Sequence, residues 1–570
     1  MAKDKSKQNK SNQRKRNDII QFVSIVAAIV LLNYLATMTF TRLDLTEDKR
    51  YSLTEATTEK LQELEDIVFI KVYLEGDLPA GYERLRDATQ EMLDEFRAYA
   101  GDNIQYEFID PSANPDKEKR NQFFQKLSDK GLEYTNVRVN EGDKRSEQII
   151  FPGAIVTYRD QEEAVQLLQS QMQTKPEVML NNSIQQLEYE LMSKVKVMTQ
   201  YAKKRVGFVR GHGELDDLET ADIQKSLSDF YIVDSVRING QLDALQLHDA
   251  IIIAGPEEKI SEKDKYVIDQ FIMKGGKVMW FVEPVTASMD SIREKGITLG
   301  VPQDVNLSDQ LFKYGARINS DFLLDLQAVP IPVVTGMVGN QPKQEFFPWY
   351  YYPLLFPQSQ HPIVHNLDAI KTQFASSIDL VGDTAIKKTP LLRTSKYTKV
   401  ASAPHRVALN ILRHEPDQRQ YSNSHQIVAA LLEGEFESVF KNRLTRKITE
   451  NPEFRFKEKS LPTKMLVVSD ADIIKNNVNR SEEKFFTLGY DKYTRKIYGN
   501  KEFVLNAMNY LLEDDNLITA RSKDFKMRLL DKPRVERERR FWQILNTATP
   551  VILILIFGVI QFYIRKKLYT

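Results

Sequence analysis

The stretch AIIIAGP at residues 250–256, followed by KVMWFVEP at residues 277–284, decides the fold of most of this chain. Both are short apolar runs that end in proline, and residues 261–274 between them have the spacing of an amphipathic helix. Apolar strands joined by a crossover helix are typical of a parallel sheet covered on both faces. The sequence therefore predicts an α/β domain around these two strands.

The same alternation extends along residues 205–531. Further strands are predicted at residues 205–211, 230–238 and 465–474, and further helices at residues 222–228, 425–434 and 500–514. Residues 296–404 interrupt the alternation, because Gly, Pro and polar residues are frequent there. We expect this segment to be an irregular insertion in the parallel-sheet domain.

A smaller α/β domain is predicted before it, at residues 42–180. Its expected elements are a helix at 54–64, strands at 67–74 and 104–110, helices at 82–100 and 116–130, and a hairpin turning at 159–161. This order resembles a thioredoxin fold. A redox pair would follow the first strand of that fold, but Gly76, Asp77, Leu78 and Pro79 stand there, so only the scaffold is expected.

Two uncharged stretches, residues 19–41 and 541–564, are each long enough to cross a membrane. The first would extend about 33 Å as a helix, against a hydrocarbon layer of about 30 Å. It exceeds the apolar run of a signal peptide, so we expect an uncleaved anchor. Aromatic residues stand at both ends of the second stretch, as is typical of membrane interfaces.

The basic tail at residues 1–18 predicts a cytoplasmic N-terminus and a large extracytoplasmic part. The basic flank at 532–540 alone would indicate the opposite orientation, but the first helix usually dominates and long domains translocate regardless of charge. The predicted parts are a cytoplasmic tail 1–18, a membrane helix 19–41, a thioredoxin-like domain 42–180, a connecting helix 181–204, an α/β domain 205–531, a basic flank 532–540, a membrane helix 541–564 and a cytoplasmic tail 565–570.

Composition and motif searches exclude several classes of function. The 79 basic and 79 acidic residues balance, so no overall charge favours nucleic acid. With no cysteine, the chain has no disulfide, thiolate nucleophile or Cys-ligated metal. It also lacks a P-loop, a zinc-protease H-E-x-x-H motif and a G-x-S-x-G elbow. We expect no cofactor and no metal.

The sequence Gly211-His212-Gly213-Glu214 is the short motif most like a functional site. It follows a predicted parallel strand, where α/β domains bind ligands. His212 and Glu214 would supply a base with its orienting carboxylate, or hydrogen bonds to a polar ligand. The alternative is a tight turn that needs glycine, with His212 as a local cap.

A dense aromatic segment, at residues 346–356, is the second candidate site. Trp349, Tyr350, Tyr351 and Tyr352 stand between prolines, which argues against a regular helix. Such rings occur at protein interfaces, sugar platforms and membrane surfaces. The alternative is a loop that buries its rings in its own core.

The combination of a basic tail, LDLTEDKRYSLTEAT at 43–57, the GHGE turn, WYYYPLL, the segment at 498–531 and a terminal anchor resembles the gliding-motility-associated GldG family of the Bacteroidota. These are auxiliary, so-called substrate-binding subunits of an ABC transporter. The resemblance implies a separate ABC ATPase and multi-span permease as partners. It also implies a glutamine-amidotransferase-like second domain, without that activity, since the nucleophilic Cys is absent.

We therefore expect a non-catalytic, membrane-anchored extracytoplasmic subunit of an ABC transporter, linked to gliding motility or cell-envelope export. It would lie in the inner membrane with two spans, both termini cytoplasmic and the large domain periplasmic. The alternative is a membrane-anchored periplasmic carbohydrate- or peptidoglycan-binding protein or hydrolase, with His212 and Glu214 as its catalytic candidates. A structural scaffold without a ligand is a third interpretation.

Overall fold

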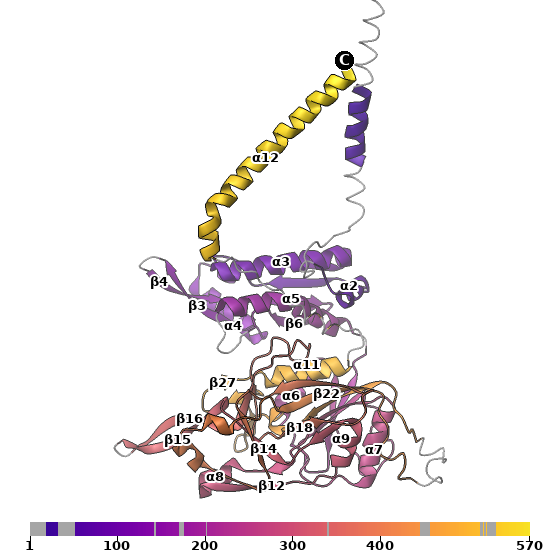
Figure 1. Ribbon diagram of the computed structural model, residues 1–570, viewed down its shortest axis with the longest axis vertical. Coiled ribbons are helices and arrows are strands. Elements are labelled where there is room, and N and C mark those ends of the chain that lie inside the picture. The colour runs from indigo at the N-terminus through magenta and orange to yellow at the C-terminus, as the bar shows by residue number, and fades with distance from the viewer. Residues whose placement is uncertain are drawn as a thin grey trace, which may run out of the picture. The chain divides into compact units, whose positions relative to one another are not determined.

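A computed structural model describes residues 19–31, 52–141, 144–169, 176–200, 202–338, 341–444, 456–512, 517, 520 and 532–569. The chain divides into two compact units (Figure 1). The larger comprises Met1–Leu43 and Ser52–Lys523, and the smaller comprises Asp44–Tyr51 and Asp524–Thr570. Several sheets with helices between them confirm the predicted α/β class.

The first part of the larger unit contains a four-stranded sheet in the order β2-β1-β5-β6. Strands β1 and β2 are parallel, and β5 is antiparallel to both β1 and β6. In β1 the alternate residues Val68, Ile70 and Val72 are buried, as in a strand with one face on a core. The elements are α2 (Glu55–Gln62), β1 (Val68–Val72), α3 (Ala80–Ala100), β2 (Ile104–Phe108), α4 (Lys117–Asp129), β5 (Gly153–Tyr158), β6 (Gln161–Gln166) and α5 (Pro176–Thr199).

One hairpin in this part is missing from the sequence prediction. Strands β3 (Thr135–Glu141) and β4 (Lys144–Ile150) pair only with each other among the described residues. Their sequences, TNVRVNE and KRSEQII, are mostly polar or charged. The apolar runs that reveal buried strands are therefore short or absent there.

The second part contains a nine-stranded sheet within the described residues, in the order β13-β18-β22-β23-β10-β9-β7-β8, with β19 also paired to β22. The five strands from β8 to β23 in this order run parallel. The strands are β7 (Arg205–Arg210), β8 (Ile232–Arg237), β9 (Ala250–Ala254), β10 (Lys277–Phe281), β13 (Ala316–Ile318), β18 (Ile378–Leu380), β19 (Lys387–Arg393), β22 (Ile427–Gly434) and β23 (Thr463–Val468).

Both faces of this sheet are covered. Every residue of β9 is buried, and its side chains alternate between two hydrophobic cores, with Ile252 in one and Ile251 and Ile253 in the other. Helices α6 (Ala221–Ser228) and α11 (Asn500–Leu512) contribute to the first core. Helices α7 (Glu262–Met273) and α9 (Ser308–Tyr314) contribute to the second.

The predicted helix at residues 425–434 is wrong, because this segment forms strand β22. It is antiparallel to β23, so the sheet is mixed and not wholly parallel as expected. Residues 428–432 are consecutively buried and apolar. A short run that is apolar on all sides suits a buried helix and a buried strand equally, and its Ala and Leu content favours a helix locally.

The segment at residues 296–404, expected as an irregular insertion with short elements, contains two long strands among shorter ones. The prolines that suggested loops, such as Pro330 and Pro348, lie in a long hairpin whose pairing shifts register at irregular points. Proline is tolerated in edge strands and at bulges. The main strands are β12 (Ile297–Pro302), β14 (Asp321–Asp325), β15 (Ala328–Val338), β16 (Gln341–Leu355) and β20 (Thr398–Ser402).

One helix among the described residues, α12 (Lys532–Tyr569), is long and apolar enough to cross a membrane, over Arg537–Ile564 (Figure 1). This range includes the predicted span at 541–564. Near the N-terminus a shorter apolar helix covers Ile19–Leu31. The rest of the predicted first span, residues 32–41, and the basic tail 1–18 lie outside the described residues.

Candidate functional site at the carboxyl edge of the parallel strands

Four neighbouring parallel strands, β7, β9, β10 and β23, end at the same edge of the large sheet. Polar residues lie within two positions of the end of three of them. The GHGE turn follows β7, Glu283 follows β10, and Asp470 follows β23. Open α/β sheets bind ligands at this edge, so it is the first place to look for chemistry.

His212 is held between two carboxylates in the GHGE turn. Its Nδ1 lies 2.9 Å from Oε1 of Glu214, and its Nε2 lies 3.0 Å from Oδ2 of Asp264. The backbone N–H of His212 also donates to Oε2 of Glu214, at 2.7 Å. Because both ring nitrogens face acceptors, both carry protons and the ring is an imidazolium.

The electrostatics agree with this protonation. The hydrogen bond to Glu214 raises the pKa of His212, against the opposing effect of burial, and the bond to Asp264 adds to the increase. Burial disfavours charge on Glu214 and Asp264, yet hydrogen bonds from His212 and from backbone N–H groups bring the pKa of each below its ordinary value. The hydrogen bonds therefore favour the charged form of all three groups.

This network joins three segments. Asp264 lies in the first turn of α7, where its N–H donates to Oγ of Ser261 and its Oδ1 accepts from the N–H of Gly240. The carbonyl of His212 accepts from Glu257 and Glu258, which follow β9. The turn requires glycine, since Gly213 has φ of +76° and an added Cβ would lie 3.1 Å from Cβ of Glu257.

The structure thus brings His212 and Glu214 together, and adds Asp264 to them. His212 is only 6 % exposed and uses both ring nitrogens internally. No ring nitrogen is left to accept a proton from a substrate. Asp264 is 52 residues from His212, and no sequence spacing identifies it as a partner.

The four aromatic candidates lie in β16 and are all buried. They share a core with Phe322, Val407 and Tyr421. Trp349 and Tyr351 have ring centroids 5.2 Å apart, and the Tyr351 hydroxyl lies 2.8 Å from Nε2 of His405. This arrangement corresponds to the second interpretation of the segment, in which the rings fill their own core. The exposed fractions are 0 % for Trp349, 6 % for Tyr350, 2 % for Tyr351 and 5 % for Tyr352.

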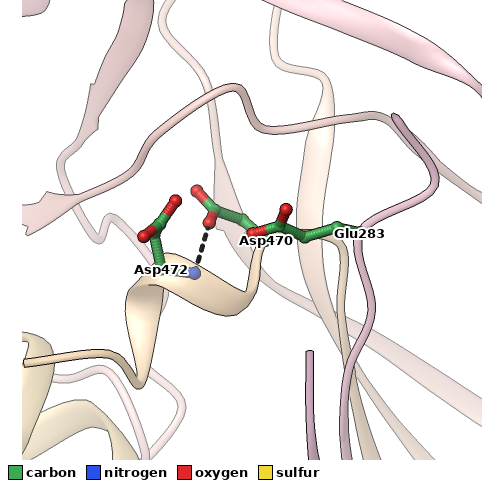
Figure 2. Close-up of side chains that lie close together, drawn as sticks. All are labelled: Glu283, Asp470 and Asp472. Atoms are coloured by element: carbon green, nitrogen blue, oxygen red, sulfur yellow. Dashed lines mark hydrogen bonds between the residues drawn. The ribbon is translucent and has the colours of Figure 1, made fainter. Parts of the chain in front are cut away.

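A cluster of three carboxyl groups lies at the same edge of the sheet. Figure 2 shows Glu283 from the end of β10 beside Asp470 and Asp472 from the turn after β23. One oxygen of each lies within 4.8 Å of the others. Asp470 accepts from the backbone N–H groups of Asp472 and Gln373, both at 2.8 Å.

Burial and mutual repulsion keep protons on this cluster. Burial, and then the charge of Asp472, raise the pKa of Glu283 to about 8. The same causes raise the pKa of Asp470 well above its ordinary value. Burial also raises the pKa of Asp472, although Lys475 and Lys371 oppose the increase. Three carboxyls this close do not all ionise near neutral pH.

The cluster adjoins a cavity of about 180 Å³, which Asp472, Lys475, Lys371 and Gln373 help to line. Chemically, the three carboxyls are able to exchange protons or to offer oxygen ligands to a hard divalent cation. The two lysines offset part of the negative charge that such a cation would need. This cluster is not among the sites predicted from the sequence. The sequence does show acidic residues just after the apolar runs of β10 and β23. It does not show that these two strands are neighbours in the sheet, which is what brings the residues together.

Comparison with known proteins gives two family matches. Residues 203–507 match the family described as "ABC-type uncharacterized transport system", and residues 47–157 match "Domain of unknown function (DUF7088)". No curated protein matches the sequence. Among solved structures, "mmIFT52 N-terminal domain" is 14 % identical and covers 54 % of this chain and 96 % of its own, with a TM-score of 0.30, which is too low to support any argument. Because the first match spans more than half of the sequence, the chain belongs to this family of ABC-transporter auxiliary proteins.

Proposed function

We propose that this protein is a non-catalytic, membrane-anchored extracytoplasmic subunit of an ABC transporter complex. Family membership supports an association with such a transporter. The sequence has no P-loop, so ATP hydrolysis would belong to a separate ATPase subunit, and transport to a separate multi-span permease.

The observation that carries the non-catalytic assignment is the double engagement of His212. It is the strongest catalytic candidate in the sequence, and it is buried with each ring nitrogen bonded to a carboxylate. A general base needs a free nitrogen within reach of a substrate proton. The geometry instead suits a fixed joint between β7 and α7.

The anchoring proposal is a two-pass protein of the inner membrane with both termini in the cytoplasm. Helix α12 and the apolar helix at Ile19–Leu31 support it. The basic tail at residues 1–18 supports the orientation. With both ends of a periplasmic body tethered, movement of the permease would pass through the anchors to the periplasmic domains.

The finer family assignment is to GldG-type proteins, linked to gliding motility or cell-envelope export. The segments at 43–57 and 498–531 support it. We further propose a thioredoxin-like domain at 42–180, supported by the strand order β2-β1-β5-β6, and an amidotransferase-like domain at 205–531, supported by the parallel strands β8 to β23. A connecting helix at 181–204 would join them.

Affinity purification of the tagged full-length protein in mild detergent tests the proposal. We expect an ABC ATPase and a multi-span permease to co-purify. Removal of residues 541–570 should abolish co-purification of both subunits. His212→Gln should not affect co-purification under conditions in which the variant is folded. Recovery of the protein alone, or with cell-wall fragments, would contradict the transporter assignment. Recovery of both subunits without the C-terminal anchor would contradict coupling through the anchors.

A further inference from the structure

A second cavity lies in the β-rich segment that interrupts the α/β domain. Its volume is about 360 Å³, within the range of small-molecule sites in proteins. None of its lining residues belongs to the carboxyl-edge site.

Asp325 holds two of the polar lining residues, Gln327 and Ser395, which form the polar wall of this cavity. This fully buried carboxylate accepts from the N–H groups of Gln327 and Ser395, both at 2.7 Å. It also accepts from the hydroxyls of Ser395 at 2.7 Å and Thr398 at 3.0 Å. Both oxygens are therefore used within the fold, and the wall is formed before any ligand arrives.

Arg393 supplies the positive charge of the lining. The described lining residues include no Asp or Glu, and the Asp325 carboxylate behind the wall has both oxygens bonded within the fold. Across the described residues, no carboxylate forms an ion pair with Arg393, whose side chain is exposed at the end of β19. A guanidinium offers a planar fork of donors that matches a carboxylate.

His425 adds a second directed group. It has φ of +57°, and its backbone N–H donates to the carbonyl of Ser395 at 3.0 Å. Its Nδ1 lies 3.3 Å from the carbonyl of Thr394 and so carries the proton, which leaves Nε2 as an acceptor. The contact with Thr394 therefore orients the imidazole where it lines the cavity.

The remaining lining combines neutral polar and apolar groups. The amides of Gln327 and Gln358 and the hydroxyl of Ser359 both donate and accept hydrogen bonds. Leu391 and the 39 % exposed ring of Phe356 offer apolar contact. A ligand with several hydroxyls on a carbon ring would bond to the polar lining groups through its hydroxyls and contact the apolar ones through its ring.

We propose that this cavity binds a small hydroxylated monocarboxylate of the uronic-acid class, with its carboxylate on Arg393. The single guanidinium balances one negative charge, whereas a phosphate monoester would bring nearly two. His425 and the two glutamines would bind the hydroxyls. The inference rests on the cavity alone and goes beyond the proposed transporter role, because binding is measured on the isolated protein.

Isothermal titration calorimetry on the full-length protein in detergent provides the test. The probe is D-glucuronate, compared with D-glucose, which lacks the carboxylate, and with D-glucose 6-phosphate. We expect glucuronate to bind at least about tenfold more tightly than either. Arg393→Gln should weaken glucuronate binding about tenfold or more, and Arg393→Lys should weaken it less.

The matched control is Arg406→Gln, an exposed arginine on β21 (His405–Ala408) outside the cavity. It should bind glucuronate like the wild type. The proposal is overturned if glucuronate does not bind at millimolar concentration, or if Arg393→Gln and Arg406→Gln bind it equally. Tighter binding of glucose 6-phosphate than of glucuronate would overturn the monocarboxylate assignment. Co-purification with transporter subunits is a separate result, so either proposal can fail alone.

Discussion

The Nε2 atom of His212 lies 3.0 Å from Oδ2 of Asp264, and this contact joins the end of β7 to the first turn of α7. Glu214 holds the other ring nitrogen at 2.9 Å. The side chains of all three residues are at most 9 % exposed. Removing the histidine would leave two buried carboxylates facing each other, which is among the more costly changes in a protein interior.

Replacing His212 with glutamine should therefore destabilise the domain by about 3–5 kcal/mol near pH 6. The folded pKa of His212 is above its ordinary 6.5, so its contribution is complete below pH 6.5 and is lost as the pH rises through the folded value. The contributions of Glu214 and Asp264 appear above their ordinary 4.5 and 3.8 and are lost as the pH falls. The measurement is thermal unfolding from pH 5 to pH 9.

The difference between His212→Gln and wild type should be largest near pH 6 and should shrink toward pH 9. The exposed His414 forms no side-chain hydrogen bond or ion pair within the described residues, and His414→Gln is the matched control. A deficit that is the same at every pH would show that His212 is not held as an imidazolium. A variant with wild-type stability throughout would contradict the role of the network.

Part of this site is readable from the sequence, because His212 and Glu214 lie two residues apart on a turn whose glycines mark it. Asp264 is not readable, since it reaches His212 only through the packing of α7 beside β7. Glu283 and Asp470 meet because β10 and β23 are neighbours in the sheet. Strand order is a property of the whole fold, and no local spacing encodes it.

Glutamine in place of Glu283 should stabilise the protein at alkaline pH. The pKa of Glu283 is raised from 4.5 to about 8, so the wild type loses stability as the pH rises through this interval. A neutral glutamine of the same shape avoids that loss, and we expect a gain on the order of 2 kcal/mol at pH 9. Near pH 5 the two proteins should be equally stable.

Thermal unfolding with EDTA present measures this effect without interference from cations that would neutralise the cluster. Glu294→Gln, at an exposed position of α8 (Met289–Lys295), serves as the control and should change little at either pH. Equal gains for the two variants would point to a general surface-charge effect. A loss of stability for Glu283→Gln at pH 9 would mean that the Glu283 charge is compensated after all.

Trp349→Ala should cost about 3–5 kcal/mol of unfolding free energy, because this ring is fully buried in its core. Phe346→Ala, in the same strand but 55 % exposed, should cost less than about 1 kcal/mol. Trp349→Phe should cost little beyond lost volume, since the Trp349 Nε1 has no hydrogen-bond partner in the described parts of the chain. Urea unfolding of the three variants checks the order. If Trp349→Ala left the free energy of unfolding nearly unchanged, the ring would not be part of the core.

The β16 segment also shows where sequence patterns become ambiguous. Its prolines correctly argue against a helix, but they also hide a strand, because proline is rare in strands except at edges and bulges. The Ile427–Gly434 segment has the opposite problem, since its alanines and leucines favour a helix locally. Its neighbours β19 and β23 supply pairing on both sides, and tertiary pairing outweighs the local preference.

A charge in the middle of α12 should prevent its insertion into a membrane. Leu553 is 60 % exposed and lies within the apolar window, where an arginine costs about 2.5–3.5 kcal/mol to insert. If α12 no longer crosses the membrane, a green fluorescent protein fused to the C-terminus stays outside the cytoplasm. We therefore expect Leu553→Arg to lower the fluorescence of this fusion. Gln543→Arg, near the end of the window where arginine reaches the headgroups, should behave like the wild type. Unchanged fluorescence of Leu553→Arg would argue that α12 is not a membrane span.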